Sequence, residues 1–191
     1  MRPLSWRLGT RPSITRIPFR YGRACLTECP QALLEIKLEI DGCMVNGYAS
    51  DCLPPLWFDK SGKRTFAEQI EDMLNAISAS ANVLNSNSSI QSLGAAVRLL
   101  WGSTEGAEHP QLLHSFGHSM VERCIIDASC RHRGQTFRNM LSSGDLYRGY
   151  STELDAWGTK TTVHPWQRDM SSGSISVRHT VGLGDPLTKG D

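Results

Sequence analysis

Hydrophobic and polar residues alternate most strictly in the segment ALLEIKLEID, residues 32–41. A period of two places alternate side chains on opposite faces of a strand, so this segment predicts a strand with one buried and one solvated face. Asp41-Gly42 is typical of a hairpin turn, because glycine accepts the positive φ that such turns need. CMVNGYAS (43–50) is therefore the expected return strand.

A third β-like segment, SITRIPFRY (13–21), precedes the hairpin, and its Pro18 favours a strand end or a sheet edge. The three segments together predict a short antiparallel meander of three strands. The basic start of the chain, MRPLSWRLGTR, is expected to form a disordered arm over residues 1–12.

Helical periodicity begins after the loop DCLPPLWFDKSGK (51–63). Thr65 and Glu68 have the spacing of a capping box and open a helix. Its apolar stripe consists of Phe66, Ile70, Met73, Leu74, Ile77 and Leu84. A second helix is expected to end near Trp101, a third to begin at Pro110, and a fourth to cover TFRNML (136–141). The predicted fold class is α+β, a three-stranded antiparallel meander followed by a helical bundle.

The periodicity fades over residues 145–173, which predicts a long irregular connection. Alternation returns in ISVRHTV (175–181) and predicts a final strand. Gly182, Gly184 and Pro186 follow it and favour a turn over a phosphate-binding loop, since a Walker motif needs a different glycine spacing and a Lys-Ser/Thr pair.

The composition is that of a globular chain, with 39% hydrophobic residues, 20% charged residues and a formal net charge of +1. A charge so near zero does not favour a nucleic acid or an anionic membrane as partner. No apolar run reaches the ~18 residues of a membrane span, and no secretory signal is evident, so a cytoplasmic protein is expected. The six cysteines contain no C-x-x-C pair and are expected to be free and mostly buried.

One helix carries a pair of histidines, His114 and His118, with Glu122 four residues further on. Two histidines at this spacing can share a metal ion, but Ser115 stands where an H-E-x-x-H motif needs glutamate. Projection of the helix places His118 and Glu122 on its polar side, which favours a solvated face over a metal site. Cys124 falls on the apolar stripe, where a thiol is usually inert packing.

Two loops flank the predicted hairpin, GRACLTECPQ (22–31) and DCLPPLWFDK (51–60). Loops held by a small rigid sheet often carry recognition. The candidate substrate-loop residues in or beside them are Tyr21, Arg23, Asp51, Leu53 and Trp57. In the alternative interpretation Trp57 and Phe58 only seal the sheet against the helices. No residue is assigned as catalytic or as a metal ligand.

Several of these segments occur in a familiar order: RIPFRYG, the alternating strand, the Asp-Gly hairpin, YASDCLPPLWFDK, the helices and VRHTVGLGDPLT. In this order the chain resembles the front portion of an enolase-superfamily protein of the mandelate racemase/muconate lactonizing enzyme type. FGHSMVERCIIDASCRHRGQTFRNML is similar to the helix that leads to that family's small connecting helix. The resemblance covers residues 13–144, as a capping domain, and 174–191, as the start of a (β/α) barrel.

The resemblance implies that loops around 21–28 and 51–58 close over a barrel mouth and select a small carboxylate substrate. The family abstracts a proton α to the carboxylate, and a divalent metal, usually Mg²⁺, stabilises the enediolate. It also implies that the catalytic barrel is missing here, so that the chain is truncated and inactive alone, without a cofactor of its own. A stand-alone binding or interaction module is the alternative, and its apolar surface would then need a cover such as a homo-oligomer.

Overall fold

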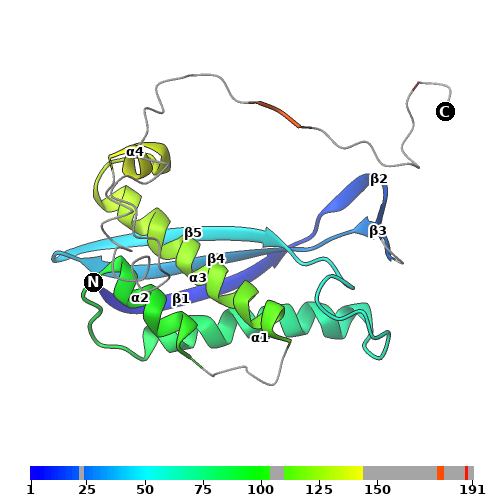
Figure 1. Ribbon diagram of the computed structural model, residues 1–191, viewed down its shortest axis with the longest axis horizontal. Helices are drawn as coiled ribbons and strands as arrows, with labels where there is room; N and C mark the ends of the chain where they lie inside the picture. The colour runs from blue at the N-terminus through cyan, green and yellow to red at the C-terminus, as the bar shows by residue number, and fades with distance from the viewer. Residues whose placement is uncertain (22–23, 104–109, 144–175, 179–187, 189–191) are drawn as a thin grey trace, which may run out of the picture.

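The computed structural model describes residues 1–21, 24–103, 110–143, 176–178 and 188. These residues form an α+β structure in which helices cover one face of an antiparallel sheet (Figure 1). The strands are β1 (Arg2–Arg11), β2 (Ile14–Tyr21), β3 (Ala24–Glu28), β4 (Gln31–Ile40) and β5 (Cys43–Cys52). The helices are α1 (Phe66–Asn85), α2 (Leu93–Trp101), α3 (Gln111–His132) and α4 (Phe137–Ser142).

The main sheet has three antiparallel strands in the order β1-β4-β5. The predicted three-stranded antiparallel sheet is therefore confirmed, and so is the hairpin of its second and third strands. The first strand was assigned wrongly. β1 takes the place expected for residues 13–21 and pairs along β4 from Arg2 opposite Glu39 to Arg11 opposite Gln31.

The expectation of a disordered arm over residues 1–12 is consequently wrong. Arg2 and Arg7 form ion pairs with Glu39 and Glu35 on the neighbouring strand, so the basic residues serve the sheet. On the other face of β1, Trp6 and Leu8 pack against the hydrophobic core. The sequence does not predict this strand, because its arginines look like those of a solvated arm. Their partners, Glu35 and Glu39, are far away along the chain and come close only when β1 pairs with β4.

β2 and β3 form a separate two-stranded hairpin that lies in the sequence between β1 and β4. Residues 14–21 are thus a strand, as predicted, but they do not belong to the main sheet. Figure 1 shows the hairpin beyond the end of that sheet. The hairpin therefore lies at the end of the main sheet, where its side chains can form one wall of a pocket.

The core lies between the main sheet and helices α1 and α3. The alternating side chains of β4 enter it as predicted, with Leu34 and Ile36 both 2% exposed. α3 crosses β5 so closely that a Cβ on Gly47 would lie 1.9 Å from the carbonyl oxygen of Cys124. A Cβ on Gly117 would lie 2.2 Å from the carbonyl oxygen of Ala76 in α1. Because Gly47 and Gly117 have no side chain, α3 can approach β5 and α1 this closely.

The predicted helices are all present. Thr65 and Glu68 form the expected capping box, with the Glu68 amide donating to Thr65 Oγ1 over 3.3 Å and the Thr65 amide to Glu68 Oε2 over 2.7 Å. α2 ends at Trp101, and Pro110 stands directly before α3. These termini are fixed by local chemistry, which explains why the sequence predicts them well.

The expected connection at 145–173 lies outside the described residues. So does most of the expected strand at 174–191, although residues 176–178 are described and belong to no strand. Among the helices of the described chain, none is both long enough and apolar enough to cross a membrane.

Candidate functional site

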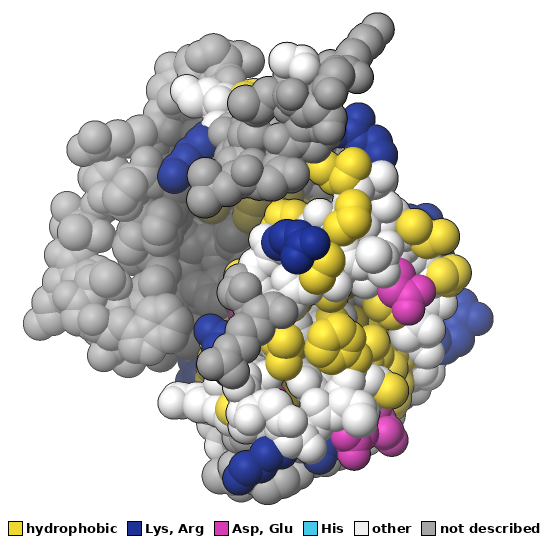
Figure 2. Space-filling view, turned by 90° about the vertical axis from the view of Figure 1, so that its right-hand side faces the viewer, with side chains coloured by type: hydrophobic (Ala, Val, Ile, Leu, Met, Phe, Trp, Pro, Cys, Tyr) yellow, Lys and Arg dark blue, Asp and Glu magenta, His cyan; other side chains and the backbone are white. Residues whose placement is uncertain are grey.

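A mainly apolar pocket of about 450 Å³ lies where the β2–β3 hairpin meets the end of β5, the loop after it and α3. Figure 2 looks onto this end of the molecule and shows hydrophobic side chains gathered there, with charged groups around them. The pocket is lined by Thr15, Phe19, Tyr21, Leu26, Cys29, Asp51, Cys52, Pro54, Trp57, Phe58 and Phe116.

An aromatic wall joins the two predicted recognition loops. The Tyr21 ring meets the Trp57 ring edge to face at 5.8 Å and lies 5.7 Å from the Phe19 ring. Its hydroxyl donates a hydrogen bond to the carbonyl oxygen of Pro55. Burial raises the pKa of Tyr21, with a smaller contribution from Cys29, so the phenol stays protonated and able to donate. Tyr21 thereby ties the hairpin to the loop after β5.

Trp57 and Phe58 play different parts in this wall. The Phe58 ring is half-buried, packs against the core and lies 5.2 Å from the Phe116 ring of α3. Trp57 is 55% exposed. The sealing interpretation therefore fits Phe58, whereas Trp57 presents an accessible aromatic surface at the pocket.

Asp51 is the one acidic residue of the described lining, and its charge is already paired. Its Oδ2 lies 2.8 Å from a guanidinium nitrogen of Arg123, which also donates to the Ser50 carbonyl over 3.2 Å. The ion pair links the end of β5 to α3. It leaves the pocket with apolar walls and no pair of free acid and base groups among the described lining residues.

The loop after β5 owes its shape to a buried side chain of α1. Gln69, only 5% exposed, accepts a hydrogen bond from the Leu56 amide over 2.7 Å and donates to the Arg64 carbonyl over 3.2 Å. Leu56 has a φ of 62°, a left-handed conformation that is uncommon for a leucine. The Gln69 amide holds this strained turn in place and so positions the residues around Trp57.

The structure brings together three of the five predicted substrate-loop residues, Tyr21, Asp51 and Trp57. Leu53 does not line the pocket. It is fully buried in the core, and its amide donates to the Pro30 carbonyl over 2.8 Å. Arg23 lies outside the described residues.

Eight of the lining residues were not predicted as site residues, among them Phe19, Phe116, Cys29 and Cys52. Phe19 stands two residues before Tyr21 on a strand, so the period of two could have placed both rings on one face. Phe116 belongs to the apolar stripe of α3. Nothing local distinguishes it from a core residue, and only the packing of α3 beside the loop brings it to the pocket.

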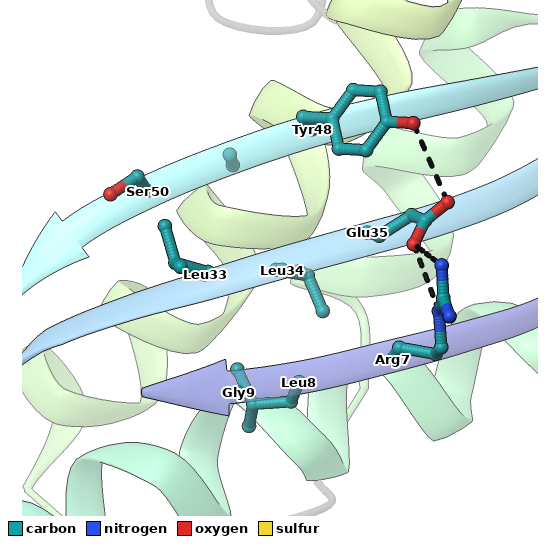
Figure 3. A pocket seen from close by; sticks show the side chains of 9 residues that line it. Arg7, Leu8, Gly9, Leu33, Leu34, Glu35, Tyr48 and Ser50 are labelled. Atoms are coloured by element: carbon teal, nitrogen blue, oxygen red, sulfur yellow. Dashed lines mark hydrogen bonds and ion pairs between the residues drawn. The ribbon is translucent and has the colours of Figure 1, made fainter. Parts of the chain in front are cut away.

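A second hollow, of about 580 Å³, lies on the face of the sheet away from the helices (Figure 3). Glu35 lies at one end of its lining, beside Arg7 and Tyr48. It accepts hydrogen bonds from Arg7 Nε over 2.9 Å and from Asn46 Nδ2 over 2.8 Å. The Tyr48 hydroxyl points to the same carboxylate at 3.5 Å. Because this carboxylate is satisfied by its neighbours, the hollow offers a ligand little beyond a shallow surface.

His118 is buried, with 2% of its surface exposed, so the prediction that it lies on a solvated face is wrong. Its Nδ1 lies 3.0 Å from Ser80 Oγ, and the Ser80 hydroxyl donates to the Ala76 carbonyl over 2.9 Å. The serine proton is thereby used, so we assign the hydrogen to His118 Nδ1 and the lone pair to Nε2. α1 and α2 cover the side of α3 that the projection made polar.

Burial lowers the pKa of His118 to about 4, and the neighbouring His114 contributes. The two rings lie 4.2 Å apart, and the Trp101 ring lies 5.3 Å from His118. The Nε2 atoms of both histidines are buried without a hydrogen-bond partner. Within the described part of the chain, no group of three or more His, Cys, Asp or Glu residues is arranged to hold a metal ion.

The six cysteines are free thiols, but the expectation that most are buried is wrong. Only Cys124 and Cys130 are buried, and burial raises the pKa of Cys124 to about 12, as suits an inert packing thiol. Cys43 and Cys52 are the first and last residues of β5 and are exposed. Alternation along a strand does not reveal that its ends lie outside the helical layer.

Comparison of the chain with protein-family models and with curated protein sequences finds no match.

Proposed function

We propose that this chain is the capping, substrate-specificity portion of a cytoplasmic enolase-superfamily protein of the mandelate racemase/muconate lactonizing enzyme type. One observation carries the proposal. The two segments that the resemblance gives as specificity loops, around 21–28 and 51–58, meet through the Tyr21–Trp57 contact and line a shared apolar pocket. The three-stranded antiparallel sheet followed by helices supports it at the level of architecture.

The pocket suits the hydrocarbon part of a small carboxylate substrate. Its aromatic walls would gain roughly 25 cal/mol for each Å² of apolar surface removed from water. The described residues offer no cluster for Mg²⁺ and no free acid–base pair in the lining. The proposal therefore gives this chain the role of covering and selecting the substrate, and assigns proton abstraction to the residues of a catalytic barrel.

Titration of the ¹⁵N-labelled chain with benzoate, a small aromatic carboxylate, tests the role of the pocket. We expect chemical shift changes at the Trp57 indole and at the backbone of residues 51–58, with millimolar affinity. Trp57→Ala should weaken binding by about tenfold, since it removes the accessible aromatic surface. Trp101→Ala is the matched control, because Trp101 is 48% exposed and lies outside the pocket. Equal affinities for the two variants, or no shift at the pocket, would contradict the proposal.

Transcript sequencing beyond codon 191 separates the cap from the stand-alone module. A cap requires an in-frame or frameshifted continuation that encodes Lys-x-Lys and spaced acidic residues, whereas unrelated sequence favours the module. Calorimetry with Mg²⁺ adds a check on the chain itself. We expect no tight stoichiometric site, and the appearance of one would overturn the division of roles between cap and barrel.

A further inference from the structure

Two cysteines, Cys29 and Cys52, lie side by side in the wall of the pocket, and the backbone holds both. Cys52 ends β5 and is opposite Gln31, the first residue of β4. The pairing continues one step further, because the Leu53 amide donates to the Pro30 carbonyl over 2.8 Å. The Cys29 amide donates to the Ser13 carbonyl over 2.9 Å, which fixes Cys29 from the other side.

This pairing determines which way the two side chains face. In an antiparallel pair with Gln31 opposite Cys52, residue 29 is opposite residue 54, so Cys29 and Cys52 are diagonal neighbours on one face. Both line the same pocket. The two thiols therefore face the same space.

The two thiols differ in access. Cys52 is exposed, whereas Cys29 is half-buried. Burial raises the pKa of Cys29, and the neighbouring Cys52 adds to the effect, so the reactive thiolate form of Cys29 is less populated. An oxidant from solution therefore reacts first with the exposed Cys52. Cys29 can then attack the mixed disulfide that forms on Cys52.

We propose that Cys29 and Cys52 form a reversible disulfide site in the pocket wall, oxidised by a low-molecular-weight disulfide such as glutathione disulfide. This inference rests on the two thiols and holds whether or not the chain is an enolase-superfamily cap. The bond joins the segment directly before β4 to the end of β5, beside the contact between Tyr21 and Trp57. It fixes the loop after β5 and changes the pocket wall from two thiols to one sulfur bridge.

The reaction proceeds by two thiol–disulfide exchanges. The Cys52 thiolate attacks one sulfur of glutathione disulfide, the glutathione S–S bond breaks, and one glutathione thiolate leaves. Cys29 then loses its proton and attacks Cys52 Sγ, so that the mixed disulfide breaks and the second glutathione thiolate leaves. The two cysteines are oxidised by two electrons, and glutathione disulfide is reduced to two glutathione molecules, which take up the two protons.

The chain offers matched controls in Cys25 and Cys43, which are exposed and do not line the pocket. Trypsin releases residues 24–37 and 38–60 as peptides, each with two cysteines in the native sequence. In the Cys25→Ser/Cys43→Ser double variant each peptide keeps one cysteine, which makes the assignment of a cross-link unique.

The experiment incubates the folded 191-residue chain with glutathione disulfide, blocks remaining thiols with iodoacetamide and maps non-reduced tryptic peptides by mass spectrometry. We expect the double variant to yield peptides 24–37 and 38–60 joined with the loss of two hydrogen atoms. Cys29→Ser should instead accumulate glutathione on Cys52, and Cys52→Ser should give no cross-link. The cross-link should need about tenfold less glutathione disulfide in the folded chain than in urea, because folding raises the effective concentration of the two thiols.

Two results would overturn the inference. One is a double variant that carries glutathione on both cysteines without a cross-link. The other is equal cross-linking in the folded and the urea-unfolded chain, which would show that folding does not bring the thiols together.

Discussion

At the scale of single residues, His118 shows how burial changes the chemistry of a side chain. The residue is 2% exposed and its ring is surrounded by Ser80, His114 and Trp101, so a charged ring would lose most of its hydration. The pKa of about 4 in the folded chain compares with 6.5 for an ordinary histidine. Between pH 4 and pH 6.5, His118 is therefore mostly protonated in the unfolded chain and mostly neutral in the folded chain.

This difference predicts an acid-sensitive stability. Because the folded pKa is the lower one, stability from His118 is complete above pH 6.5 and is lost as the pH falls toward 4. The loss amounts to about 3 kcal/mol over that window. Urea unfolding at pH 7 and pH 4.5 measures it. His118→Leu should flatten the pH dependence, because leucine occupies the site without a group that titrates. An unaltered slope in His118→Leu would contradict the assignment.

At the scale of elements, the close packing of α3 on β5 and α1 governs the architecture. Gly47 and Gly117 are the points of closest approach, where backbone meets backbone. Alternation and capping predict that these elements exist, and the Thr65 capping box even predicts where α1 begins. They do not predict which glycine is a contact point, because a missing side chain leaves no hydrophobic signal.

Gly47→Ala should therefore destabilise the fold by roughly 2–4 kcal/mol, since its Cβ would overlap the Cys124 carbonyl and force α3 away from the sheet. Gly9→Ala, on the outer face of β1, is the control, because a Cβ there meets nothing within 4 Å. We expect it to change stability by less than about 0.5 kcal/mol. Thermal unfolding followed by circular dichroism compares the two variants. Similar unfolding midpoints would contradict the prediction that a Cβ at residue 47 destabilises the fold.

At the scale of the whole molecule, β1 completes the three-stranded sheet as one of its two edge strands. It covers one edge of the central strand β4, and Trp6 and Leu8 complete the core over α1. Trp6 Nε1 also donates to Asn82 Oδ1 over 3.2 Å, which ties the first strand to the first helix. The N-terminal segment is thus a structural part of the domain.

Deletion of residues 1–12 should remove the cooperative thermal transition, because it uncovers both the edge of β4 and the core beneath Trp6. Arg7→Gln provides the contrast, since it breaks only a surface ion pair worth at most about 1 kcal/mol. A truncated chain with an unchanged unfolding midpoint would restore the interpretation of a disordered arm.

The sequence by itself determined the features that depend on neighbours along the chain: the β4–β5 hairpin through its alternation and Asp41-Gly42, and the helices through their caps and stripes. It also singled out Tyr21 and Trp57 as candidate substrate-loop residues, and the structure brings both to one pocket. Only the tertiary structure decided that β1 completes the sheet, that His118 is buried, and that Phe116 and the pair Cys29–Cys52 join the pocket. These features depend on contacts between segments far apart in the chain, and local periodicity carries no information about which segments will meet.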